Sequence, residues 1–131
     1  MKAGTIVLNR VSKPEFLSEV VRKGNIITSR MNALKEKVRI IGDVRGKGLM
    51  IGCEFVNPKE AKDCCGLFPP NGEAAAKIQN ICFKNKLVME KGGRNGSVMR
   101  CLCALTVTDE EIDRAMNIFE SAVIEVNKEY V

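Results

Sequence analysis

The chain has 131 residues, the length of one domain able to bury a hydrophobic core without metal or disulfide support. Hydrophobic residues make up 45% and charged residues 28%, so a disordered or fibrous chain is excluded. The net charge is +5, but the basic residues are scattered and aromatic residues reach only 5%, which argues against a nucleic-acid partner. We interpret the charge as a solvated surface, with an anionic ligand or a more acidic partner domain as the alternative.

The six cysteines occur without a histidine and without a C-x-x-C pair, so their spacing predicts no metal site. Most of them lie in apolar runs and are interpreted as small hydrophobic residues. The chain shows no signal-peptide pattern and no apolar run of about 18 residues, so we expect no membrane partner. A cytoplasmic location with reduced thiols is therefore predicted. The cysteines are Cys53, Cys64, Cys65, Cys82, Cys101 and Cys103.

The chain opens on Met1–Val11, which is apolar enough to pack but carries no helix-start signal. A helix is predicted next, over residues 12–35. Ser12 can cap it, Glu15 completes an S-x-x-E capping box, and apolar residues then recur at three- and four-residue spacing. Gly24 inside this helix is expected to weaken it slightly.

Two strands, Val38–Arg45 and Leu49–Val56, are predicted to form a hairpin around the tight turn Gly46–Gly48. Strict alternation in the second strand places four apolar residues on one face of the sheet. These residues are Leu49, Ile51, Cys53 and Phe55.

The second half of the chain repeats this order of helix and strands. Asn57–Asn71 is predicted to be a loop because prolines and a glycine interrupt it. A helix over Gly72–Lys84 follows, then a short strand at Leu87–Met89, a turn at Lys91–Gly96 and a strand over Ser97–Leu105.

The last helix is predicted to begin at Thr108, because Thr108 and Glu111 have the spacing of a capping box. Its buried stripe is expected to contain Ile112, Ala115, Met116, Phe119, Val123 and Val126. The order helix, two strands, helix, two strands, helix predicts a single α+β domain over residues 1–131. A small, mostly antiparallel sheet would carry helices on one side.

The motifs of several enzyme classes are missing. Without histidine there is no Ser–His or Cys–His pair, and no phosphate-binding or dinucleotide-binding glycine loop occurs. The glycine-rich string Gly42–Gly48 lies in the hairpin and is interpreted as serving turn geometry. No residue of the chain is therefore assigned a catalytic role.

One basic residue, Arg100, interrupts the apolar run Ser97–Leu105. A charge at such a position is costly unless it is paired or reaches water. An arginine there can offer a fixed fork to the carboxylate of a substrate. The alternatives are an edge-strand residue that faces water and an internal salt bridge with Asp or Glu.

Three strings resemble the class III aminotransferases, the family of ornithine, acetylornithine, 4-aminobutyrate and diaminobutyrate aminotransferases. Residues 14–24 resemble the helix that opens the family's small domain, and residues 43–55 its V-R-G-x-G-L-M-x-G hairpin. Residues 93–115 resemble the family's G-x-V-x-R, then L-T-[IV]-T-x-E-E-[IL]-D. The resemblance covers about residues 12–126.

This resemblance implies the fold of the C-terminal domain of fold-type-I enzymes, which bind pyridoxal phosphate in a large domain and are usually homodimers. It implies transfer of an amino group from an amine or ω-amino acid to a keto acid such as 2-oxoglutarate. Arg100 matches the small-domain arginine that holds the α-carboxylate of the acid substrate. Two departures are the family's paired prolines, replaced here by Cys103-Ala104, and the loop Asn57–Asn71, which matches no family string.

In that family the Schiff-base lysine, the acid that pairs with the pyridine nitrogen and the phosphate loop precede this domain. We therefore expect a C-terminal small domain, with residues 1–11 as an interdomain segment, that alone binds no pyridoxal phosphate and is inactive. Its expected partners are the large cofactor-binding domain, an amino-acid or keto-acid substrate and a second copy of the chain. The alternative is a stand-alone module that binds a small carboxylate or a protein. The sequence does not specify the amino donor.

Overall fold

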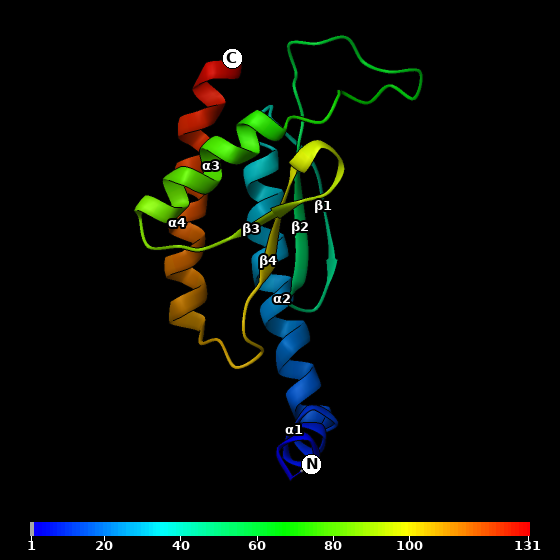
Figure 1. Ribbon diagram of the computed structural model, residues 1–131, viewed down its shortest axis with the longest axis vertical. Coiled ribbons are helices and arrows are strands. Elements are labelled where there is room, and N and C mark those ends of the chain that lie inside the picture. Colours follow the sequence, from blue (N-terminus) through cyan, green and yellow to red (C-terminus); the bar gives the residue numbers. More distant parts are fainter. Residues whose placement is uncertain (1) are drawn as a thin grey trace.

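The computed structural model describes residues 2–131, which form four α-helices and four β-strands (Figure 1). The first half contains α1 (Lys2–Val11), α2 (Pro14–Lys35), β1 (Ile41–Lys47) and β2 (Met50–Phe55). The second half contains α3 (Gly72–Lys84), β3 (Glu90–Gly92), β4 (Val98–Leu102) and α4 (Asp109–Asn127). The predicted α+β class is confirmed. No helix among the described residues is long and apolar enough to cross a membrane.

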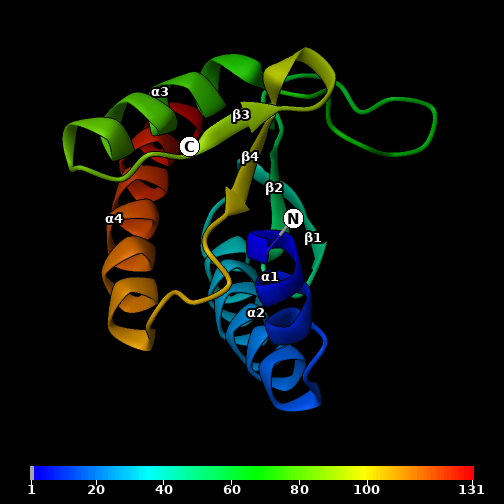
Figure 2. The same ribbon diagram turned by 60° about the horizontal axis from the view of Figure 1, so that its bottom comes forward.

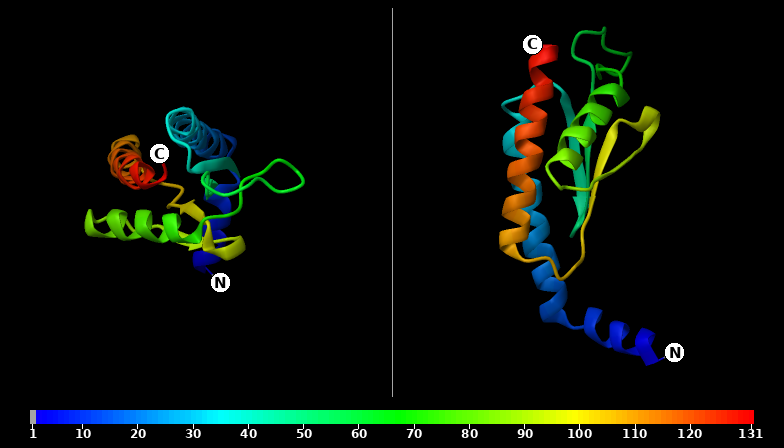
Figure 3. Two further views of the ribbon diagram at one scale, coloured as in Figure 1. Left: turned by 90° about the horizontal axis from the view of Figure 1, so that it is seen from above. Right: turned by 60° about the vertical axis from the view of Figure 1, so that its left-hand side comes forward.

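The four strands form one antiparallel sheet in the order β1-β2-β4-β3. Because side chains alternate along a strand, one face of the sheet is apolar and the other is open to solvent. On the apolar face α2 packs on β1 and β2, α3 packs on β3 and β4, and α4 lies against both helices (Figure 3). The strand residues buried in this core are Ile41, Ile51, Cys53, Phe55 and Met99.

Gly24 allows α2 to pack tightly on the β1–β2 hairpin. A Cβ atom at Gly24 would lie 2.1 Å from the carbonyl oxygen of Gly48, in the hairpin turn. Gly48 itself has a φ of +57°, which favours glycine. The glycine that the sequence marked as a weakness of the helix is therefore required by a close approach of two backbones.

Helix α4 begins as the sequence predicts. The Thr108 hydroxyl accepts a hydrogen bond from the Glu111 backbone N–H, and the Glu111 carboxylate accepts one from the Thr108 N–H. That second bond lowers the pKa of Glu111. Five of the six residues predicted for the buried stripe are buried, and Ala115 is half-buried.

The N-terminal predictions need correction. Residues 2–11 form helix α1, whose residues 2–10 are all exposed, and Figure 3 shows it projecting from the end of α2. Met1 lies outside the described residues. The Ser12 hydroxyl donates to the Leu8 carbonyl at 2.8 Å, so it bonds back to α1 and does not cap α2. Lys13 is the N-cap residue of α2 and makes no side-chain capping bond.

Three strand predictions are displaced. The first strand is 41–47 where 38–45 was predicted, because buried residues precede the strand and made the apolar run look longer than the ladder. The third is 90–92 where 87–89 was predicted, since that apolar segment packs on the core before pairing begins. The last, predicted over 97–105, ends at Leu102, which pairs with Met50, the first residue of β2.

Candidate functional site

Arg100 lies in the middle of β4, on the open face of the sheet. It is opposite Gly52 of β2 and opposite Glu90 of β3. The residues on either side of it, Met99 and Cys101, face the core, and Met99 is completely buried. The charge that interrupts an apolar run is therefore directed toward solvent, while its neighbours supply the apolar face.

The guanidinium of Arg100 is paired with one carboxylate in the described part of the chain. Its Nη2 donates to Oε1 of Glu90 at 2.7 Å, and the two side chains are 43% and 53% exposed. The salt bridge that the sequence left open is confirmed, but β4 is an inner strand, so the edge-strand alternative is wrong. An exposed ion pair contributes about 0–1 kcal/mol, so another carboxylate can compete for this arginine at low cost.

Gly92 of β3 provides the surface on which this guanidinium lies. A Cβ atom at Gly92 would come within 2.6 Å of Nη2, 3.0 Å of Cζ and 3.2 Å of Nε of Arg100. Gly52, on the other side of Arg100, also has no side chain. Gly92 therefore leaves room for the guanidinium on the sheet, whereas a Cβ atom at Gly52 would meet Val98 of β4 at 3.1 Å.

Arg100 is among the residues that line two hollows, one on each face of the sheet. A cavity of about 350 Å³ lies between β4, α2, α4 and the segment that leads into β3, and its lining includes Glu90 and Arg100. Apolar side chains supply most of the remaining lining, among them Met31, Met89 and Phe119. A second hollow of about 290 Å³ lies on the open face of the sheet, over β1, β2 and β4, and is again lined by Arg100. A cationic group beside an apolar cavity is suited to an amphipathic acid.

Arg45, the other arginine of the open face, is more fully engaged. Its Nη1 donates to Asp43 at 2.8 Å and to Glu54 at 2.7 Å. The Arg45 hydrogen bond lowers the pKa of Asp43. Two carboxylates thus neutralise Arg45, whereas Arg100 shares its charge with one.

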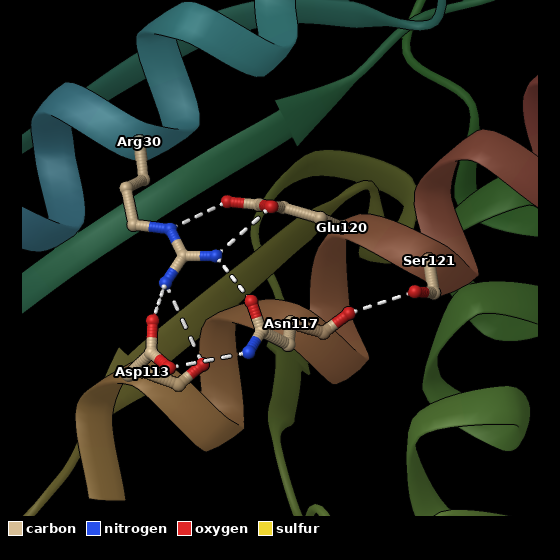
Figure 4. A network of polar contacts seen from close by, with 5 residues as sticks. All are labelled: Arg30, Asp113, Asn117, Glu120 and Ser121. Carbon is tan, nitrogen blue, oxygen red and sulfur yellow. Dashed lines mark hydrogen bonds and ion pairs between the residues drawn. The ribbon is translucent and has the colours of Figure 1, made fainter. Parts of the chain in front are cut away.

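Arg30 of α2 is the most extensively bonded arginine of the described residues, and no sequence signal marked it. Figure 4 shows its guanidinium between three side chains of α4 that are three and four residues apart. Nε and Nη2 donate to Glu120 at 2.7 and 3.0 Å, Nη1 to Asp113 at 2.7 Å and Nη2 to Asn117 at 2.7 Å. This network binds α2 to α4, on the side of the helices away from the sheet, and is structural.

The cysteines divide into two groups. Burial raises the pKa of the Cys53 and Cys101 thiols to about 12 and that of Cys82 to about 11. These three and half-buried Cys103 pack on or in the core, as the sequence predicts. Cys64 and Cys65, in the predicted loop Asn57–Asn71, are exposed. No cluster of three potential metal ligands occurs in residues 2–131.

The chain is similar to known proteins over nearly its whole length. The model of the class III aminotransferase family matches residues 1–123. The diaminobutyrate–2-oxoglutarate aminotransferase of Haemophilus influenzae is 35% identical over 128 residues, which are 98% of this chain and 28% of the relative. The acetylornithine aminotransferase of Clostridium acetobutylicum is 38% identical over 113 residues, 86% of this chain and 24% of the relative. The chain thus spans less than a third of the length of these curated relatives.

Solved structures show the same fold. The N-acetylornithine aminotransferase of Stenotrophomonas maltophilia superimposes with a TM-score of 0.75 at 21% identity, covering 92% of this chain and 29% of that one. A phospholyase from Arthrobacter in complex with phosphoethanolamine superimposes with a TM-score of 0.79 at 18% identity, covering 93% and 28%. At these identities the likeness concerns the fold.

Proposed function

The chain belongs to the class III aminotransferase family, and on that premise we propose that it is the C-terminal domain that binds the substrate carboxylate in such an enzyme. The enzyme transfers an amino group from an amine or ω-amino acid to a keto acid such as 2-oxoglutarate. Arg100 binds the carboxylate of the acid. The observation that carries this proposal is the half-exposed Arg100 guanidinium, held by one carboxylate beside a 290 Å³ hollow on the open face of the sheet.

Glu90 already shows that a carboxylate fits this guanidinium at hydrogen-bonding distance, 2.7 Å. The planar fork of an arginine can donate two parallel bonds to a carboxylate, which a single bond to Glu90 does not use up. A substrate carboxylate therefore binds beside Glu90 or replaces it. The apolar side chains of that hollow, Met50, Val98 and Leu102, shield the carbon chain of the acid from water, which strengthens the charged bond.

Class III aminotransferases use pyridoxal phosphate, which forms a Schiff base with a lysine. The residues described here do not match that requirement. Every lysine of residues 2–131 is exposed or half-exposed, and none lines the 350 Å³ cavity. We therefore propose that the cofactor is held by residues of a large partner domain and that this chain by itself does not catalyse transamination.

A chimeric enzyme tests the proposal. The matching 128-residue segment of the Haemophilus influenzae relative is replaced by this chain, and transfer from 2,4-diaminobutyrate to 2-oxoglutarate is measured. The chimera is expected to be active, and Arg100→Gln to raise the KM for 2-oxoglutarate about 10- to 100-fold, the effect of losing a charged hydrogen-bonding pair. Arg94→Gln, in the exposed turn before β4, is the matched control and should leave KM within about twofold. An unchanged KM in Arg100→Gln would refute the proposal.

A further inference from the structure

The loop between β2 and α3 carries a pair of thiols that the proposed function does not use. Residues 57–71 connect β2 to α3, and Figures 1 and 2 show this segment as the green loop that projects from the body of the domain. Cys64 and Cys65 stand in the middle of this segment, and both are exposed. Their Sγ atoms are 4.0 Å apart.

Asp63 holds the turn that brings these thiols together. Its backbone N–H donates to the Leu67 carbonyl at 2.8 Å, and its own carbonyl accepts from the Gly66 N–H at 2.9 Å. Its carboxylate Oδ1 accepts from the N–H groups of Cys65 and Leu67 at 2.8 and 2.9 Å. Gly66 supplies the positive φ, +77°, that closes the turn. Four hydrogen bonds through one residue therefore fix the backbone turn that carries the two cysteines.

The separation of the sulfur atoms indicates whether the two thiols are better placed for a disulfide or for bonds to one bridging atom. A disulfide needs the sulfur atoms about 2.05 Å apart, so the 4.0 Å pair would have to close by about half against those hydrogen bonds. Two bonds of about 2.3 Å to one bridging atom place the sulfur atoms about 3.4 Å apart at a pyramidal trivalent centre and about 3.8 Å apart at a tetrahedral one. The turn thus matches a single bridging atom better than a direct sulfur–sulfur bond.

The number of ligands restricts that atom further. No third cysteine, histidine or carboxylate of residues 2–131 completes a metal cluster with these thiols. The two thiols alone therefore do not satisfy a divalent metal that prefers four protein ligands. A trivalent centre that already carries one organic substituent needs only two thiolates.

We propose that Cys64 and Cys65 form a bidentate binding site for monosubstituted trivalent arsenicals. In the reaction with an organoarsenic oxide, R–As=O, both S–H bonds and the As=O bond break, and two S–As bonds form. The two thiol protons leave with the arsenic oxygen as water, so the products are R–As(S–Cys)₂ and H₂O. No oxidant or reductant is involved.

The chain contains a second close pair, Cys101 and Cys103, which is the natural competitor. Both are half-buried, and burial raises the pKa of Cys101 to about 12. The thiolate is the species that bonds to a soft centre, and a protonated, partly buried thiol is the slower partner. The exposed pair is therefore the preferred site.

Phenylarsine oxide added to the reduced 131-residue chain tests this site, with intact mass as the readout. We expect one adduct per chain at one equivalent, stable to excess 2-mercaptoethanol and removed by dithiothreitol, which offers two thiols. Cys64→Ser and Cys65→Ser should each abolish the stable adduct. The matched control, the double variant Cys101→Ser with Cys103→Ser, should retain it.

Circular dichroism of each variant separates loss of the site from loss of the fold, and the two loop variants should keep the wild-type spectrum because their side chains are exposed. An adduct that persists in Cys64→Ser, or that disappears in the Cys101/Cys103 double variant, would assign the chemistry to the other pair. Either result, or the absence of a stable adduct on the wild-type chain, overturns the proposal. The KM of the chimera for 2-oxoglutarate tests the proposed function and not this arsenical site.

Discussion

Arg30 of α2 and Arg100 of β4 both meet carboxylates, but the protein holds them differently. Arg30 donates from Nε, Nη1 and Nη2 to three side chains of α4, and its own side chain is 25% exposed. Arg100 donates from Nη2 to Glu90 and is 43% exposed. An arginine whose fork is filled by the protein ties elements together, whereas one that is partly engaged at the edge of a cavity has donors to offer a ligand.

The largest effect on stability is expected from Arg30→Ala. It removes the bonds that join α2 to α4 and leaves Glu120, itself 27% exposed, without its arginine. We expect the free energy of unfolding to fall by about 2 kcal/mol, the cost of losing charged hydrogen bonds that are partly solvated. Urea denaturation of the chain measures it.

Arg22 provides the control for that prediction, since it lies on the same helix and also reaches α4, through Asp109. Its side chain is 43% exposed, so Arg22→Ala should lower the free energy of unfolding clearly less than Arg30→Ala does. Equal losses in the two variants would show that the Arg30 network has no special role. Arg100→Gln should likewise have a small effect on stability. Loss of its single exposed ion pair should lower the free energy of unfolding by less than about 1 kcal/mol.

A smaller effect is expected from Gly92→Ala, which alters the position of Arg100 without removing it. The new Cβ would lie 2.6 Å from Nη2, and the flexible guanidinium can move away, so the fold is kept. In the chimera the KM for 2-oxoglutarate should rise about fivefold, while the free energy of unfolding changes by less than about 1 kcal/mol. Gly4→Ala, where a Cβ meets nothing within 4 Å, is the control. A normal KM in Gly92→Ala would mean that the observed position of the guanidinium is not the one used for binding.

The smallest effect is a pH dependence at Arg22. Its hydrogen bonds lower the pKa values of Glu19 and Asp109 from their ordinary values of 4.5 and 3.8. The stabilisation is thus complete above those ordinary values and is lost as pH falls through the lowered ones. The difference in urea midpoint between wild type and Arg22→Ala should shrink between pH 5 and about pH 2. A difference that stays constant over this range would contradict the assigned ion pairs.

Arg100 could be identified from the sequence and Arg30 could not, because the partners of Arg30 are distant along the chain. Arg100 was found because a charge inside an apolar strand is conspicuous locally, and the α4 cap was found because Thr108 and Glu111 are three residues apart. Glu90 was missed because β3 was predicted three residues too early, which conceals the cross-strand pair. Arg30 gave no signal, since its partners lie 83 to 90 residues away.

Glycines show the same limit. Gly24 and Gly92 each make room for a group that is distant in sequence, the Gly48 carbonyl and the Arg100 guanidinium. From composition and spacing alone, these two glycines appear only as interruptions of a helix or strand pattern. The family resemblance supplied what local patterns could not, the position of Arg100 relative to a substrate, and that role stays a prediction.

The central claim, that Arg100 binds the α-carboxylate of the acid substrate, is tested most directly with two amino acceptors in the chimera. 2-Oxoglutarate carries that carboxylate, and 4-oxobutanoate is the same acid without it. We predict that Arg100→Gln lowers kcat/KM for 2-oxoglutarate by about 10- to 100-fold and leaves the value for 4-oxobutanoate within about twofold. An equal loss with both acceptors would contradict the account.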